Sequence, residues 1–447
     1  MSNHKTPSIR FKEFTDDWEQ RKLGDMLISL QNNTLSRAEL SNEAGVAKNV
    51  HYGDVLIKFG EVLDASKEQL PMILDESVLS KYKASFLQNG DVIVADTAED
   101  STVGKCCEIA GLNNEVVLSG LHTIPYRPIE KFAFGYLGYY LNSSAYHNQL
   151  IPLMQGIKVT SISKSAMQDT DIVYPKSVEE QGKIGDYFQS LDHLITLHQR
   201  KYEKLVNVKK SMLDKMFPKN GKKVPEIRFK GFTDDWEQRK FSELVQIERG
   251  GSPRPIDDFI TDASNGLNWV KIGDAPTQGN YITKTAEKIR PEGLSKTREV
   301  HPGDLILSNS MSFGKPYIMG IDGCIHDGWL LIRNTYGVFD LTFLCHLLGT
   351  PQMLSQYRSL AAGSTVNNLN KELVGNTYVT IPSITEQRVL GAYLEQLDNL
   401  ITLHQRKGKA AVSGCSNDAN NSKGVCCKAR DFGYKCHKKD EPNRFDA

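Results

Sequence analysis

The stretch from Ser177 to Phe217 constrains this chain more than any other, because it has the pattern of one long amphipathic helix. Large side chains recur at alternating intervals of four and three residues, the heptad pattern of a helix that packs against a partner helix. These positions are Ile184, Phe188, Leu191, Ile195, His198, Tyr202 and Leu205. The sequence therefore predicts a partner for this helix.

The partner is present later in the same chain. The sequence LDHLITLHQRK at 191–201 returns as LDNLITLHQRK at 397–407. Ser177 and Ser383 each precede a glutamate by three residues, and this spacing is the capping box that starts a helix. The heptad positions of the second copy are Leu390, Leu394, Leu397, Ile401 and His404. We predict that the two helices pack together, with His198 and His404 as polar positions that fix their register.

A second repeat shows that the whole unit is duplicated. The sequence IRFKEFTDDWEQRK at 9–22 returns as IRFKGFTDDWEQRK at 227–240, so each copy has this opening, a globule and a long helix. The globules differ greatly in sequence, but both contain a Gly-Asp turn before a short apolar run, at Gly90 and Gly303, which predicts a buried strand. We expect mixed α/β (α+β) globules. We also expect Trp18 and Trp236 to pack each globule against a helix end.

These landmarks predict the following organisation of the chain. It comprises an N-terminal arm at 1–17, a first globule at 18–176, a central helix at 177–218, a linker at 219–231, a second globule at 232–382, a shortened second helix at 383–407 and an atypical tail at 408–447.

Composition excludes some partners and permits others. Lysine plus arginine equals aspartate plus glutamate at 54 each, so the net charge does not indicate nucleic acid. Residues 200–223 are nevertheless strongly basic, and a local patch can bind DNA even in a neutral protein. No stretch is apolar enough to span a membrane, and the first residues do not form a signal peptide. Few cysteines precede residue 408, so we predict a reduced, cytoplasmic protein without a disulfide framework.

Motifs for catalysis are missing from the sequence. It contains no phosphate-binding loop, dinucleotide-binding loop, adenine-methyltransferase motif or nuclease motif, and we predict neither a catalytic residue nor a metal site. Cys106 and Cys107 are expected to be buried filler. Loops rich in hydroxyl, amide and lysine groups suit base edges and phosphates, although ordinary turns have the same composition. The candidate DNA-binding residues are Thr97, Ser101, Thr102, Lys105, Lys158, Thr160, Ser161, Ser308, Asn309, Ser310, Ser312, Lys315, Ser364, Thr365, Asn367 and Asn368.

Taken together, these features resemble the specificity subunit of type I restriction-modification systems. The resemblance covers residues 8–407 and rests on the tandem repeat, the DDWEQRK openings, the Gly-Asp strands and the sequence from Ile381 to Gln387 that leads into the second helix. The loop GSTVNNLNK at 363–371 is also typical of the family, whereas its counterpart GIKVTSISK at 156–164 fits less well.

The resemblance implies a fold and a function. Each globule would be a target-recognition domain that reads one half of a two-part site in double-stranded DNA. The two helices would form an antiparallel coiled coil that sets the spacer between the half-sites and docks partner subunits. The partners would be two modification subunits, which methylate adenine with S-adenosylmethionine, and restriction subunits, which use ATP and Mg²⁺. The chain itself would be non-catalytic and bind no cofactor. The alternative is a coiled-coil adaptor that does not bind DNA.

The chain departs from this family pattern after Lys407. The first helix continues with heptad positions, but the tail at 408–447 has none and carries four cysteines in a polar context. We therefore expect a disordered tail. We also expect Ile184, Phe188 and Leu191 to lack the partner turns that would cover them, which would make the chain less stable.

Overall fold

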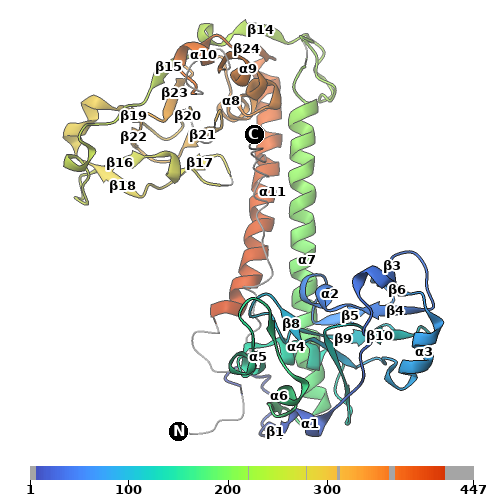
Figure 1. The fold of residues 1–447 in the computed structure, drawn as a ribbon. Coiled ribbons are helices and arrows are strands. Elements are labelled where there is room, and N and C mark those ends of the chain that lie inside the picture. The colour runs from blue at the N-terminus through green and yellow to red at the C-terminus, as the bar shows by residue number, and fades with distance from the viewer. Residues whose placement is uncertain (1–6, 220, 278, 310–312, 362–367, 418–447) are drawn as a thin grey trace, which may run out of the picture. The chain divides into compact units, whose positions relative to one another are not determined.

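The computed structural model describes residues 7–219, 221–277, 279–309, 313–361 and 368–417 of the chain. The chain divides into two compact units, residues 1–197 with 408–447 and residues 198–407, which we call unit 1 and unit 2. The boundary falls inside the first long helix, so unit 2 contains the last turns of a helix that starts in unit 1 (Figure 1). Within the described ranges no helix is long and apolar enough to cross a membrane.

Unit 1 is a mixed α/β globule followed by the first part of a long helix. Its globule comprises β1 (Glu19–Lys22), α1 (Leu23–Met26), β2 (Leu27–Ser29), β3 (Leu40–Ser41), β4 (Ala47–Val50), α2 (Tyr52–Ile57), β5 (Val62–Asp64), β6 (Met72–Ile73), α3 (Glu76–Tyr82), β7 (Val92–Ala95), β8 (Thr97–Ala98), β9 (Cys106–Ala110), β10 (Val117–Ser119), β11 (Thr123–Pro128), α4 (Tyr136–Asn142), α5 (Ser144–His147), β12 (Thr160–Ser161), α6 (Lys164–Gln168) and β13 (Asp171–Tyr174). The helix is α7 (Val178–Lys215).

Unit 2 contains the end of α7, a second globule and a second long helix. The globule comprises β14 (Glu237–Lys240), β15 (Gln246–Arg249), β16 (Leu267–Val270), β17 (Tyr281–Ile282), β18 (Glu287–Ile289), β19 (Arg298–Val300), β20 (Leu305–Ser308), β21 (Pro316–Met319), β22 (Gly323–Ile325), β23 (Trp329–Arg333), α8 (Leu341–Leu348), α9 (Pro351–Ala361), α10 (Lys371–Gly375) and β24 (Tyr378–Ile381). The second long helix is α11 (Ile384–Asn417), of which unit 2 contains the part up to Lys407.

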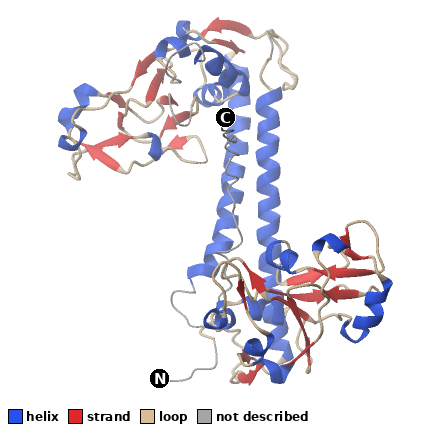
Figure 2. Cartoon of the chain, in the orientation of Figure 1, coloured by secondary structure: helices blue, strands red, loops and turns tan. Residues whose placement is uncertain are grey.

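Strands and helices occur together in both globules (Figure 2). The two globules share the topology of their five-stranded sheet despite their different sequences. Unit 1 has a five-stranded sheet in the order β2-β11-β7-β9-β5, and unit 2 has one in the order β15-β23-β20-β21-β17. In both sheets the last pair is parallel and the other pairs are antiparallel. The predicted strands after Gly90 and Gly303 are β7 and β20, so the prediction is confirmed. Each turn needs its glycine, because φ is +91° at Gly90 and +93° at Gly303.

A second sheet of four strands flanks the first in each globule. The orders are β10-β4-β6-β3 in unit 1 and β18-β16-β22-β19 in unit 2. The pairs β10–β4 and β22–β16 are both parallel, and both globules add an antiparallel strand on the far side of β4 or β16. The fourth strand differs, because β3 lies beside β6 whereas β19 lies beside β22. Divergence between the globules therefore reaches the sheet edges but not the central strands.

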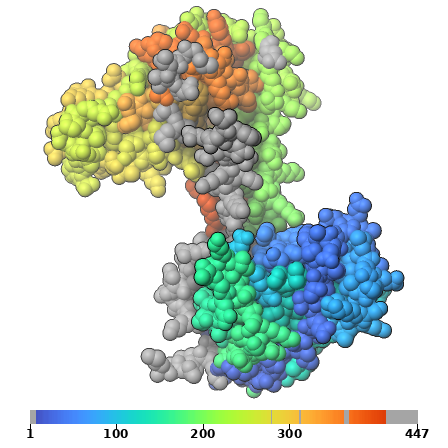
Figure 3. Space-filling model, in the orientation of Figure 1, coloured from blue at the N-terminus to red at the C-terminus, as the bar shows by residue number. Residues whose placement is uncertain are grey.

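The five-stranded sheet separates two apolar cores, because successive residues of a strand point to opposite faces. In unit 1, Cys106 belongs to the core that also contains α4 and α5, and Cys107 belongs to the core on the other face. Both cysteines are fully buried, which confirms that they fill space, and burial raises the pKa of the Cys107 thiol to about 12. Figure 3 shows one face of each globule as a space-filling model.

The repeated opening sequence clamps each globule to the start of its helix. In unit 1, Arg10 donates to both carboxylate oxygens of Glu180, at 2.6 and 2.7 Å, and the indole of Trp18 donates to the same carboxylate at 3.2 Å. In unit 2, Arg228 and Trp236 make the same contacts with Glu386, at 2.7, 2.8 and 3.3 Å. Both tryptophans are buried, which confirms that they pack the globules against helix ends.

This clamp corrects one detail of the predicted capping boxes. The serine half of each box is present, because the amide of Glu180 donates to Ser177 and the amide of Glu386 donates to Ser383. The glutamate half is replaced, since each carboxylate accepts from an arginine and an indole instead of reaching back to the serine amide. A bidentate, charge-assisted bond to arginine is stronger than one bond to an amide, so the clamp prevails.

In unit 2 the end of α7 packs antiparallel against α11. His198 contacts His404, and further along α7 Lys209 contacts Asp398, so the partner number falls as the α7 number rises. Leu390, Leu394, Leu397 and Ile401 are all buried, as the heptad pattern predicts. However, α11 extends to Asn417, ten residues past the predicted end at 407. Residues 418–447 of the predicted tail lie outside the described residues.

In unit 1 the first turns of α7 pack on the globule. Ile184 lies against the core around α4, and the ring of Phe188 stacks on Tyr139 with 5.5 Å between ring centroids. Both side chains are only partly exposed, as is Leu191. The expectation that these residues depend on partner turns for their cover is therefore wrong for Ile184 and Phe188, because their own globule supplies it.

Candidate nucleic-acid interface

In unit 1 the end of β7 and the start of β11 carry a polar cluster. The imidazole of His122 lies 3.4 Å from the carboxylate of Asp96, and Thr97 donates to that carboxylate at 2.7 Å. The Tyr52 ring lies edge-on to His122 at 5.3 Å between centroids. His122 has φ of +56°, a left-handed conformation that non-glycine residues adopt at an energetic cost. The cluster presents donors, acceptors and an aromatic ring, the groups that read base edges.

A short hairpin lies beside this cluster. Gln155 and Ser161 exchange two backbone hydrogen bonds, at 2.9 and 2.8 Å, and β12 pairs with β8, which contains Thr97. The hairpin tip carries Ile157, whose exposure is 102%, and the exposed Lys158. A fully exposed isoleucine beside a lysine is unusual for a loop that only connects two strands, but it suits contact with a thymine methyl group and a phosphate.

Unit 2 has a corresponding cluster at the end of β20 and the start of β23. Asn309 donates to the carbonyl of Asp327 at 2.8 Å, and Ser252 donates to the Asp327 carboxylate at 3.1 Å. The His326 imidazole lies 2.9 Å from the same carboxylate. The backbone contact of Asn309 with Gly328 matches that of Asp96 with His122 in unit 1. Each globule therefore has a histidine–aspartate cluster at the same place in the fold.

The candidate DNA-binding residues of unit 1 gather around this face to different degrees. Ser101, Lys158 and Ser161 are exposed, and Thr160 is partly exposed. Thr97 and Thr102 each donate to a neighbouring aspartate, Asp96 or Asp100. Those donors therefore have local partners, whereas the hairpin residues are open to a ligand.

The candidates of unit 2 divide in the same way. Ser308 and Asn309 are buried, and Asn368 is exposed. Ser310, Ser312, Ser364, Thr365 and Asn367 lie outside the described residues.

Lys105 and Lys315 have partners within the protein. Lys105 donates to the carbonyls of Leu56 and Phe59 at 2.9 and 3.0 Å. The ammonium of Lys315 lies 4.8 Å from the centre of the Tyr317 ring. Burial lowers the pKa of both lysines. The glycine turns expected before both lysines are present, whereas the carbonyl and aromatic groups that the lysines face do not follow from the sequence.

The heptad histidines meet at a symmetric position. The Nδ1 atoms of His198 and His404 lie 3.0 Å apart, and the two residues are separated by the repeat offset of 206. Each helix therefore contributes the same position of its repeat to one contact. His404 is buried, and desolvation together with the charges of Lys201, His198 and Lys407 lowers its pKa.

Exposed leucines mark another surface on each long helix. Leu194 and Leu197 of α7 are each 48% exposed, and Leu400 and Leu403 of α11 are each 43% exposed. They occupy matching positions of the repeated sequence, outside the heptad seam. The heptad pattern does not predict an exposed surface at these leucines. However, the two copies are identical at these positions outside the seam, and this identity indicates a second contact.

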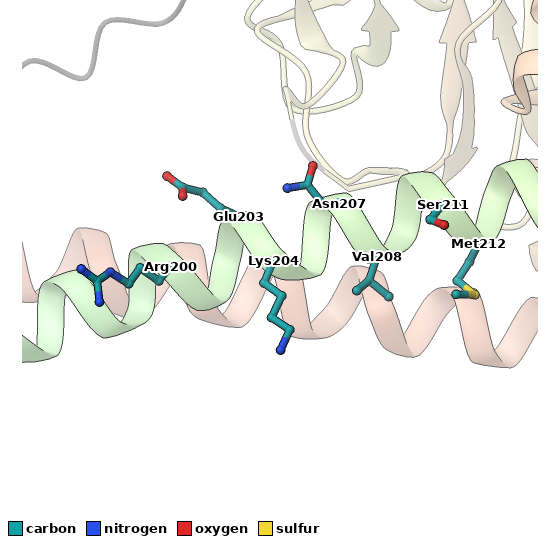
Figure 4. Close-up of a pocket in the computed structure, with 7 residues that line it drawn as sticks. All are labelled: Arg200, Glu203, Lys204, Asn207, Val208, Ser211 and Met212. Carbon is teal, nitrogen blue, oxygen red and sulfur yellow. The ribbon is translucent and has the colours of Figure 1, made fainter.

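A shallow groove runs along the part of α7 in unit 2. Its lining comprises Arg200, Glu203, Lys204, Asn207, Val208, Ser211 and Met212 (Figure 4). Val208 and Met212 pack against the core of unit 2, while Arg200, Glu203 and Lys204 are exposed. One helix supplies the whole lining, so the groove is a surface depression with a basic rim. No group of three or more histidine, cysteine, aspartate or glutamate side chains that could hold a metal ion occurs among the described residues.

Comparison with known families identifies the class of the protein. The profile of the family described as type I restriction modification DNA specificity domain matches residues 15–207 and again 233–412. The two matches cover most of the chain and follow the duplication. The chain therefore belongs to this family, with two DNA specificity domains in tandem, and the resemblance is confirmed. The adaptor alternative is not favoured.

Two curated relatives come from Methanocaldococcus jannaschii. The type I restriction enzyme MjaVIII specificity subunit is 25% identical over 271 residues, covering 58% of this chain and 62% of the relative. The putative type I restriction enzyme MjaX specificity subunit is 23% identical over 415 residues, covering 90% and 91%. The chain thus spans less than two thirds of the first relative and nearly all of the second.

Solved structures share the fold. The type I restriction-modification system S subunit from M. genitalium has a TM-score of 0.57 at 11% identity, covering 92% of this chain and 97% of that one. A chain from a structure on complex assembly and conformational transition of the type I restriction-modification system has a TM-score of 0.50 at 18% identity, with the same coverages. These likenesses support the mixed α/β fold with long helices.

Proposed function

We propose that each globule reads one half of a two-part site in double-stranded DNA. The observation that carries this proposal is the pair of matching faces at the ends of β7 and β20. Both faces lie at the same place in a common sheet, yet their side chains differ. A common frame with different exposed donors and acceptors is what two different base sequences require.

Within the first face, the hairpin at 155–161 and His122 would contact bases, while Lys158 would contact a phosphate. Phosphate contacts hold the protein in register, and base contacts specify the sequence. In the second face, His326, Asp327 and Asn368 would have this role. The basic rim at Arg200 and Lys204 would add attraction that does not depend on sequence.

We further propose that modification subunits dock on the exposed leucine pairs. Leu194 with Leu197, and Leu400 with Leu403, are two copies of one apolar surface, so they suit two copies of one partner. Such a complex would methylate adenine with S-adenosylmethionine, and restriction subunits using ATP and Mg²⁺ would join it in the cytoplasm. Aspartate at both leucines of one pair should remove one modification subunit in native mass spectrometry. Retention of both would exclude that surface.

A domain exchange tests the DNA proposal. Residues 22–175 are replaced by those of another specificity subunit, and the methylated sites of a host carrying the complex are sequenced. We expect one half-site to change while the other half-site and the spacer stay the same. The proposal would be contradicted if the unaltered complex showed no salt-dependent binding to duplex DNA. A change in both half-sites together would also contradict it.

A further inference from the structure

One carboxylate of α11 joins three other parts of unit 2. Asp398 accepts a hydrogen bond from His346 of α8 at 2.9 Å and another from Asn280, just before β17, at 2.8 Å. Lys209 of α7 donates to its other oxygen. The donors lie 52, 118 and 189 residues away in sequence, so this contact is a product of the tertiary fold.

Two hydrogen bonds fix the orientation of the His346 ring. Its Nδ1 lies 2.8 Å from the carbonyl oxygen of Thr342, and its Nε2 lies 2.9 Å from Asp398. The ring is therefore held from both of its nitrogens. Burial alone would raise the pKa of Asp398, but the bonds from His346 and Lys209 outweigh it and lower that pKa. The His346–Asp398 contact therefore holds the globule to a carboxylate of the helix.

The globule is also held one turn before Asp398. The hydroxyl of Tyr281 donates to Glu395 at 2.8 Å. Tyr281 begins β17, the strand at one edge of the five-stranded sheet, and it follows directly after Asn280. The sheet edge and α8 thus meet the same two turns of α11, so the sheet has a defined orientation on this helix.

Unit 1 has a matching contact with a different donor. Asp192 occupies the position of Asp398 in the repeated sequence and accepts a hydrogen bond from Tyr139 at 2.7 Å. Tyr139 lies in α4, as His346 lies in α8, and each helix follows the last strand, in chain order, of its five-stranded sheet. The duplicated chain therefore retains the aspartate although the globules around it have diverged.

We propose that Asp398 is a positioning residue that holds the second recognition face at a defined orientation on α11 and so restricts the spacer between half-sites. Asp192 has the same role for the first face. This inference rests on the proposed function. Asp398 contacts no DNA in this role, so its loss leaves both half-site sequences unchanged and widens the range of spacers that the complex accepts.

The test uses the full chain assembled with its modification subunits. Methylation is measured on duplexes that carry both half-sites with the native spacer or with one base pair more or less. For Asp398→Ala and His346→Leu, we expect the preference for the native spacer to fall about tenfold, the value of one charge-assisted hydrogen bond. His346→Gln retains a donor toward Asp398 and should restore the preference. Asn399→Ala, at an exposed neighbouring position, is the matched control.

Melting temperatures of the same samples separate positioning from stabilisation. If Asp398 only stabilises the fold, its replacement lowers methylation on all three spacers by one factor, and that result would overturn the inference. If Asp398→Ala does not fold, Tyr281→Phe provides a milder variant, because it removes only the bond to Glu395. An unchanged spacer preference in both Tyr281→Phe and His346→Leu would also overturn the inference. Failure of the unaltered complex to recognise a two-part site would instead contradict the proposed function.

Discussion

At the scale of single residues, burial separates lysines that hold the globule together from lysines that are exposed to solvent. Lys105 gives its ammonium protons to two carbonyls of its own globule, whereas Lys158 stands exposed on the hairpin tip. The sequence shows both as lysines next to glycine-containing turns. It cannot separate them, because the carbonyls of Leu56 and Phe59 come from a segment more than forty residues earlier.

This contrast gives a prediction for two alanine variants. Lys158→Ala should weaken binding to all duplexes alike and lower the slope of log affinity against log salt by about one, since one phosphate contact is lost. Lys105→Ala should leave that slope unchanged and lower the melting temperature, because two buried carbonyls lose their donor. Salt titrations of duplex binding and thermal unfolding check both variants. A changed slope for Lys105→Ala with an unchanged slope for Lys158→Ala would reverse the assignment.

At the scale of elements, the long helices were predictable and their anchors were not. The heptad spacing identifies the buried face of α11 and places His198 and His404 on the seam, because a helix repeats its faces locally along the sequence. The Arg10–Glu180 and Arg228–Glu386 clamps and the Asp398 contacts depend on partners far apart in the chain. A local pattern such as the capping box identifies the glutamate but not the arginine that competes for it.

The histidine pair predicts how the stability of the helix pair depends on pH. The folded-state pKa of His404 is lowered, so folding favours its neutral form. Its contribution is present above the ordinary imidazole pKa of about 6.5 and is lost as the pH falls below that value. Protonating His404 also places its positive charge close to the charges of Lys201 and Lys407. We expect the free energy of unfolding to fall between about pH 7.5 and about pH 5.5.

Urea unfolding at the two pH values measures this change. His404→Leu removes the titrating group and should flatten the difference. His193→Asn is the control, because His193 is exposed and asparagine is the residue that the second copy carries at that position. An equal loss of stability at low pH in His404→Leu would assign the effect to other groups.

At the scale of the whole molecule, the duplication seen in the sequence and the compact units of the fold have different boundaries. The sequence repeat restarts near residue 227, whereas unit 2 begins at residue 198. The reason is visible at the end of α7, where Met216 and Phe217 are buried in the core of unit 2. The Phe217 ring stacks on Phe343 at 5.7 Å and lies edge-on to Trp236 at 6.1 Å. The core of the second globule therefore includes residues that belong to the first sequence repeat.

This offset predicts which fragments fold. Residues 198–407 should unfold cooperatively, because they retain Met216, Phe217 and the Lys209–Asp398 contact. Residues 219–407 lack Met216 and Phe217. This fragment should be less stable, since the loss of each large buried apolar side chain costs about 1.5–3 kcal/mol. Thermal unfolding of the two fragments by circular dichroism compares them, and Phe217→Ala within the longer fragment isolates one side chain. Equal melting temperatures for the two fragments would show that the second globule is complete without the end of α7, and the unit would then begin where the sequence repeat does.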